Sequence, residues 1–191
     1  MNQVQEMPRL FTLERLPEAL ERLKVVTGMM QQQPGFLGAE VLQNLATPET
    51  LLVLHAWRDL AGWTTFSNSL AKQEFMAGRP RGLYGMIECG LNWRSLQADG
   101  TRAGAILRRE VIRRDDVKLR RGDGVEECQT FVYQDDLPAY AGCTLRLTRL
   151  ADATAGSSES DPGAIVDEIY ESLFSVKAPV IAPSAATVAG A

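Results

Sequence analysis

Two apolar stretches decide the fold of this chain, Pro34-Gly35-Phe36-Leu37-Gly38-Ala39-Glu40-Val41-Leu42 and Leu51-Leu52-Val53-Leu54-His55-Ala56-Trp57. A short polar break at residues 44–49 separates them. Period-2 apolar segments around such a break predict a β-hairpin, with strands over residues 36–43 and 50–57. In the second strand one face carries Leu51, Val53, His55 and Trp57, and the other carries Leu52, Leu54 and Ala56. Because both faces are apolar, we expect a cover on each side of the sheet.

Helical patterns lie on both sides of this hairpin. Residues 16–30 place apolar side chains three and four positions apart, with Pro17 in the first turn, which is typical of an amphipathic helix. A second helical region runs from about residue 60 to residue 76, with a bend or break at residues 67–69. The hairpin is therefore expected to lie between two helices.

Strands complete this unit at its two ends. Residues 8–14 alternate well enough for a first strand, and residues 83–96 form a fourth strand bent at its glycines. The order β-α-β-β-α-β predicts an α+β fold with a ferredoxin-like domain over residues 1–98.

The remainder of the chain is predicted to be a strand-rich extension over residues 99–176. Its strands are expected at residues 105–114, 126–134 and 143–150. A terminal helix is expected over residues 162–176, because Asp161-Pro162 suits a helix start and apolar residues follow at helical spacing. Residues 177–191 are Ala, Pro, Ser and Val without periodicity, which indicates a disordered tail. No internal repeat between the two halves is evident in the sequence.

A basic patch between residues 108 and 121 stands out in a chain of net charge −4. One interpretation is a charged strand edge that discourages pairing with other chains. The other is a site for an anionic ligand or partner. The sequence leaves both open.

Composition excludes several classes of function. The net charge of −4 argues against general nucleic-acid binding, which depends on neutralising phosphates. No apolar run approaches the roughly 18 residues of a membrane span, and the first residues lack the pattern of a secretory signal, so a cytoplasmic location is expected. The single histidine, His55, excludes a metal site that needs two imidazoles from one chain.

The Pro-Gly-Phe turn, the Gly38-Ala39-Glu40 strand and the strand-ending Trp57, followed by an aromatic helix, resemble the antibiotic-biosynthesis-monooxygenase-like family. The resemblance covers residues 8–97. It implies a dimeric α/β barrel in which two ferredoxin-like protomers pack their sheets face to face, hence a homodimer that supplies the missing cover. Some members of that family oxidise aromatic polyketides or quinols without a cofactor, and others degrade haem.

The residues that haem-degrading members use do not carry over to this sequence. Their first-strand asparagine is absent, since residues 11–13 are Phe, Thr and Leu, and the second helix ends at residues 74–79 without a histidine. We therefore expect no haem and no other cofactor.

Cofactor-free oxygenation needs a base, an aromatic wall and a group that stabilises an anion. His55 is the candidate base, because its unperturbed pKa lies near neutrality. The candidate substrate-binding side chains, for an aromatic or hydrophobic small molecule, are Trp57, Trp63, Phe66, Tyr84 and an arginine, Arg79 or Arg81.

Two functions of different classes stay open. One is a monooxygenase acting on an aromatic or quinol-type molecule in the barrel cavity. The other is a non-catalytic module that binds a ligand or recruits a partner on the same fold. The long extension favours the second, since catalytic members of the family are usually little more than the barrel.

Overall fold

The computed structural model describes residues 3–81, 83, 85–86, 91–100, 106–114, 117–119, 125–134, 138–152 and 161–178. The strands are β1 (Gln3–Leu10), β2 (Phe36–Asn44), β3 (Thr50–Trp57), β4 (Gly85–Met86), β5 (Leu91–Gly100), β6 (Ile106–Ile112), β7 (Val125–Tyr133), β8 (Thr144–Leu150) and β9 (Ala164–Lys177). The helices are α1 (Leu16–Gln31), α2 (Leu60–Ser67) and α3 (Leu70–Ala77), with 3-10 turns at Leu13–Arg15 and Pro138–Tyr140.

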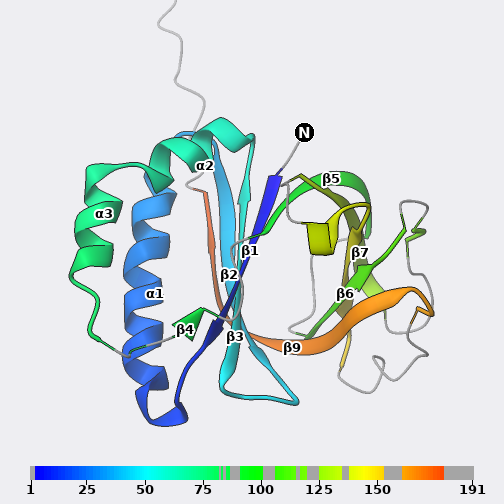
Figure 1. The fold of residues 1–191 in the computed structure, drawn as a ribbon, viewed down its shortest axis with the longest axis horizontal. Helices are drawn as coiled ribbons and strands as arrows, with labels where there is room; N and C mark the ends of the chain where they lie inside the picture. The colour runs from blue at the N-terminus through cyan, green and yellow to red at the C-terminus, as the bar shows by residue number, and fades with distance from the viewer. Residues whose placement is uncertain are drawn as a thin grey trace, which may run out of the picture.

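The strands belong to one antiparallel sheet that curls and closes on itself (Figure 1). Its order is β3-β2-β9-β6-β8-β7-β5-β1-β4, and β1 also pairs along its whole length with β3. Eight strands therefore form a closed ring, while the short strand β4 pairs with the end of β1 that β5 leaves free. Closure gives each of these eight strands two neighbours, as in a barrel.

The barrel consists of two halves with the same strand order. The first half runs β5-β1-β3-β2 and the second runs β9-β6-β8-β7. In each half the order along the sheet is fourth, first, third and second strand, which is the ferredoxin-like arrangement. The halves join at two seams, where β2 pairs with β9 and β5 pairs with β7. The predicted α+β, ferredoxin-like fold is confirmed, and the second sheet comes from the same chain.

The elements of the first half agree with the sequence-based expectation apart from their bounds. The hairpin, the long helix and the divided second helix are confirmed as β2–β3, α1 and the pair α2–α3. The first strand starts at Gln3 and ends at Leu10, earlier than the predicted 8–14. The boundary predicted at residue 98 stays a prediction, although β5 continues through it to Gly100.

The predicted terminal helix over residues 162–176 is wrong, because Ala164–Lys177 forms β9. This strand lies between β2 and β6 and pairs with both. Its β-branched and aromatic side chains, among them Ile169 and Tyr170, suit a strand at least as well as a helix. The strands β2 and β6 supply the backbone hydrogen-bond partners of β9. The spacing of apolar residues in the sequence gives no information about these partners.

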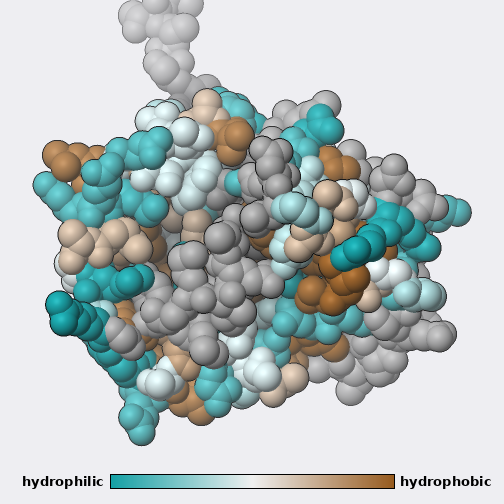
Figure 2. All heavy atoms as spheres, viewed as in Figure 1, coloured by the Kyte–Doolittle hydropathy of each residue, from teal (hydrophilic) through white to brown (hydrophobic). Residues whose placement is uncertain are grey.

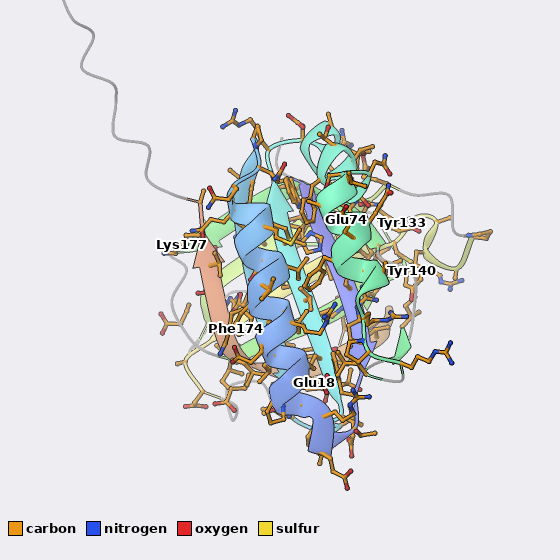
Figure 3. All side chains as sticks on the ribbon, turned by 90° about the vertical axis from the view of Figure 1, so that its left-hand side faces the viewer. Glu18, Glu74, Tyr133, Tyr140, Phe174 and Lys177 are labelled. Atoms are coloured by element: carbon orange, nitrogen blue, oxygen red, sulfur yellow. The ribbon has the colours of Figure 1, made fainter. Side chains whose placement is uncertain are left out.

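Two apolar cores lie on opposite sides of the first half of the sheet. One fills the barrel interior and combines side chains of both halves, such as Leu54, Trp93 and Leu145. The other lies between the outer face of the sheet and the helices, and includes Leu23 and Val53. Figure 3 shows α1 and α3 side by side across this outer face. The helices thus cover one half of the barrel from outside.

The outer face of the second half is built differently. Ion pairs occupy it, with Arg146 donating to both oxygens of Glu110 at 2.7 and 2.8 Å. Arg108 donates to both oxygens of Asp167 at 2.8 and 2.6 Å. Within the described residues no α-helix follows α3, so none packs on this face. The basic patch predicted around residues 108–121 is therefore partly buried, and its Arg108 is paired with an acidic side chain.

In the described part of the chain, no helix is long and apolar enough to cross a membrane.

Candidate functional site

The site is organised around His55, near the end of β3 on the face toward the helices. Its side chain is 1% exposed. The indole Nε1 of Trp57 donates a hydrogen bond to His55 Nδ1 at 3.1 Å. Because an indole nitrogen only donates, Nδ1 must accept, and the neutral imidazole carries its proton on Nε2.

The Nε2 atom of His55 is buried and has no hydrogen-bond partner. His55 lines a cavity of about 70 Å³ between the sheet and the helices α1, α2 and α3. Most of the lining is apolar, and its other polar side chains are Arg9, Arg22 and Lys72. A buried N–H without a partner is costly, so it marks this cavity as a place where an acceptor atom would be favoured.

Aromatic rings form one wall of the cavity and support it from behind. The ring of Trp63 lies over His55, with centroids 4.7 Å apart and planes at 35°. Trp57 packs behind them, stacked on Phe66 at 6.0 Å and edge-on to Phe36 at 5.3 Å. This packing holds the imidazole in one orientation, and Trp63 itself lines the cavity.

Local sequence places these rings. Asp59 caps α2, since its carboxylate accepts the Gly62 N–H at 2.9 Å. Gly62 lets α2 approach the sheet closely, because a Cβ there would lie 3.0 Å from the Pro34 carbonyl oxygen and 3.2 Å from Trp57 Cε3. Trp63 follows directly and is held against His55.

The electrostatics of the cavity are positive. Burial, followed by the positive charges of Arg9 and Lys72, lowers the pKa of His55 to about 3. Burial and Arg9 also lower the pKa of Lys72. No acidic side chain is among the described residues that line the cavity. His55 is thus neutral at physiological pH and acts as a hydrogen-bond donor.

Helix α3 is attached to α1 by Arg22. Its guanidinium donates to the carbonyl oxygens of Phe75 at 2.8 Å and Gly78 at 3.4 Å, and it lies 4.3 Å from the centre of the Phe75 ring. No residue of α3 is fully buried. The helix that carries Lys72 is therefore fixed mainly at its C-terminal end.

The structure brings together some of the predicted site residues. His55 and Trp63 line the cavity, while Trp57 and Phe66 form its second layer. Arg79 and Arg81 are exposed and do not line it, and Tyr84 lies outside the described residues. The predicted sharing of faces is confirmed, but the face of His55 and Trp57 lies against the helices rather than in the barrel interior.

Sequence reasoning missed Arg9, Arg22 and Lys72. Each has a signal in hindsight, because each is a cation at an apolar position of its element. Arg22 lies beside Leu23 on the buried face of α1, and Lys72 lies three residues before Phe75 on α3. Charged residues at such positions are expected to face a cavity or a partner.

The barrel interior holds a second cavity, of about 80 Å³. Both carboxylate oxygens of Glu40 accept hydrogen bonds from the guanidinium of Arg149, one of them at 2.8 Å. This buried pair joins β2 of the first half to β8 of the second. No cluster of His, Cys, Asp and Glu suited to a metal ion occurs in the described part of the chain.

Comparison with known proteins identifies the region that builds this site. Residues 13–78 match the family "antibiotic biosynthesis monooxygenase". The match spans α1, β2, β3, α2 and α3, and so contains His55, Trp63 and Lys72. A search of curated protein sequences gave no match.

Solved structures share the fold across both halves. A proposed monooxygenase of Fusobacterium nucleatum subsp. nucleatum has a TM-score of 0.63 and 8% identity, over 92% of this chain and 94% of that chain. An anthrone oxidase-like protein has a TM-score of 0.65 and 8% identity, over 93% and 94%. A proposed monooxygenase of Lactobacillus acidophilus has a TM-score of 0.56 and 8% identity, over 93% and 97%. Identities this low establish a common fold only.

Proposed function

We propose that the protein is a cofactor-independent monooxygenase of a phenol- or quinol-type aromatic molecule, because residues 13–78 match the antibiotic biosynthesis monooxygenase family. The reaction takes place in the cavity between sheet and helices. The observation that carries this proposal is the buried, unpartnered Nε2–H of His55, in an apolar cavity that Arg9 and Lys72 make positive. Such a site favours an oxyanion on an otherwise apolar molecule.

The reaction balances without a further reductant when the substrate is an anthrone. Its CH₂ group becomes a carbonyl by losing two hydrogens and taking one oxygen atom from O₂. The second oxygen atom leaves with the two hydrogens as water, and the substrate supplies all four electrons. Ionising the substrate to its oxyanion raises its electron density and makes it reactive toward O₂.

The side chains divide this work. His55 donates its Nε2–H to the oxyanion, and Arg9 and Lys72 add positive charge. The face of Trp63 positions the aromatic ring. His55 is a donor here rather than the base expected from its unperturbed pKa, since a group with a pKa of about 3 accepts a proton poorly at neutral pH.

The size of the cavity requires a conformational change. At about 70 Å³ it is smaller than the roughly 300–1,000 Å³ of typical small-molecule sites. Helix α3 has no fully buried residue, so its displacement is the easiest way to admit an aromatic ring. The substrate would then fill the cavity once α3 has returned to its original position.

The small cavity also favours the alternative, a non-catalytic module that binds a small anion. The same donor and cations would hold such a ligand without reaction. Consumption of O₂ separates the two functions.

The test is an oxygen-electrode assay with 1,8-dihydroxyanthrone and a panel of naphthoquinols. We expect one O₂ consumed per anthrone oxidised. His55→Phe, which keeps a ring but loses the donor, should lower kcat roughly 100-fold. His55→Gln, which keeps an N–H but cannot act as a base, should retain more activity than His55→Phe. Full turnover by His55→Phe would contradict the donor role, and no O₂ uptake by the wild type would favour the binding module.

A homodimer remains a proposal that rests on the family resemblance, and a cytoplasmic location also remains a proposal. An uncovered sheet face does not support a dimer, because the second half of this chain covers that face. Light scattering measures the oligomeric state directly.

A further inference from the structure

The oxyanion site lacks an assigned proton acceptor. His55 Nδ1 already accepts the Trp57 N–H, and Nε2 carries the ring proton. Guanidinium groups do not serve as proton acceptors in proteins, so Arg9 and Arg22 are not candidates. No carboxylate is among the described residues lining the cavity. Among the described residues that line the cavity, Lys72 is the remaining titratable group.

Lys72 shares the cavity of His55, where the substrate oxygen is proposed to bind. It lines the same cavity from α3. Its Nζ lies 5.3 Å from the centre of the Trp63 ring and 5.8 Å from that of Phe66. The amine therefore lies near the ring expected to stack on the substrate.

The surroundings of Lys72 favour its neutral form. The charged groups that share its cavity are Arg9 from β1 and Arg22 from α1, with neutral His55 from β3. None of the ion pairs formed by described residues involves Lys72. Burial and the charge of Arg9 lower its pKa, which increases the fraction of free amine near neutrality.

We propose that Lys72 is the general base that removes the hydroxyl or enol proton of the aromatic substrate in the His55 cavity. This inference rests on the proposed function. The Nζ lone pair takes the proton, the O–H bond breaks, and its electron pair stays on the substrate oxygen. An ammonium and an oxyanion result, the latter facing His55 Nε2–H. The ammonium returns its proton when the second oxygen atom leaves as water.

Two substitutions separate this role from simple electrostatic support. Lys72→Arg keeps the positive charge but cannot accept a proton, and Lys72→Met loses both properties. Lys24→Met is the matched control, because Lys24 lies exposed on α1 and pairs with Glu21. Circular dichroism and thermal unfolding establish that each variant is folded.

The kinetic readout is the pH profile of kcat/KM for 1,8-dihydroxyanthrone. In Lys72→Arg we expect a fall of roughly 100-fold at pH 7. The loss should shrink as the pH approaches the substrate's own pKa, and it should be smaller for more acidic analogues. Lys24→Met should match the wild type. An arginine variant with the wild-type rate and profile would overturn the proposal, as would a loss independent of pH and of substrate acidity.

A second readout needs no turnover. 4-Nitrophenol absorbs in the visible only as its phenolate, so absorption reports ionisation of the bound molecule. We expect phenolate at a lower pH in the wild type and Lys24→Met than in free solution, and a clearly smaller shift in Lys72→Met, in which His55 and Arg9 remain. A wild type that ionises nitrophenol but consumes no O₂ contradicts the proposed function while supporting the role of Lys72. A Lys72→Met protein that ionises nitrophenol like the wild type contradicts the role of Lys72 alone.

Discussion

The two halves of the barrel have the same strand order but different outer faces. The first half is covered by α1, α2 and α3, which enclose an apolar core and a cavity with an unpartnered nitrogen at His55. The second half presents charges that are paired with each other, such as Arg146 with Glu110. The shared topology therefore does not make the site. The helices make it, by burying polar groups that the sheet leaves without partners.

This difference predicts that the halves respond differently to substitution. Buried charges in the second half should affect stability and leave the cavity unchanged. Buried polar groups in the first half should affect ligand binding and chemistry. Each prediction below tests one side of this division.

The largest effect is expected at Glu110, which is fully buried and accepts two hydrogen bonds from Arg146. Glu110→Gln leaves the buried guanidinium of Arg146 with Asp161, at 3.6 Å, in place of its closer counter-ion, which should lower the free energy of unfolding by about 3–5 kcal/mol. Urea unfolding measures this loss. The double variant Glu110→Leu with Arg146→Met is the control and should be more stable than Glu110→Gln. Nitrophenol ionisation by the folded fraction should equal that of the wild type, and a changed value would refute the division between the halves.

The second prediction concerns the pH dependence of stability that His55 causes. Its pKa falls from 6.5 to about 3 on folding, so between these values the unfolded chain binds one proton more than the folded chain. The contribution of His55 to stability is complete above pH 6.5 and is lost as the pH falls toward 3. The slope approaches about 1.4 kcal/mol per pH unit.

His55→Gln should remove this contribution from the pH dependence of unfolding. The measurement is urea unfolding of both proteins at several pH values from 7 to 4. Parallel curves would mean that His55 is not held neutral by burial.

The smallest effect is expected at Arg79, which is exposed and does not line the cavity. Arg79→Gln should change nitrophenol affinity by less than about twofold, because exposed charges are screened by solvent. Isothermal titration calorimetry measures this, with Arg9→Gln as the contrasting variant. A larger effect at Arg79 than at Arg9 would mean that the group that binds the anion lies outside the cavity.

The apolar residues on the surface do not indicate a binding site. Figure 2 shows the apolar side chains over the helical side as separate patches among hydrophilic ones. Scattered exposed residues such as Leu70, at 68% exposure, are ordinary on a folded protein.

Sequence periodicity predicted the first half of the barrel well, because each of its helices and strands carries its own pattern. It assigned Val53 and Trp57 to one face of β3 and Leu54 to the other, and this is confirmed. It could not decide which face lies under the helices, since both are equally apolar. The sequence therefore left open whether His55 lies under the helices or in the barrel interior.

The second half was harder to predict because its partners are remote. In β9, residues such as Val166 and Tyr170 find their backbone partners on β6, and no local pattern reveals that pairing. The equal strand order of the halves is also hidden, since none of the described residues between the strands of the second half form an α-helix. Lys72 was missed because its position three residues before Phe75 does not reveal that Arg9 and His55 line the same cavity.

The pairing of β2 with β9 limits when the barrel can close during synthesis of the chain. Glu40 and its partner Arg149 are 109 residues apart in the sequence, and β9 follows later still. At a synthesis rate of about 5–20 residues per second, roughly 5–20 s pass between the appearance of the two residues. During that time the outer edge of β2 has no neighbour and can pair with other chains. The speed of translation, rather than the speed of strand pairing, decides when this barrel can close.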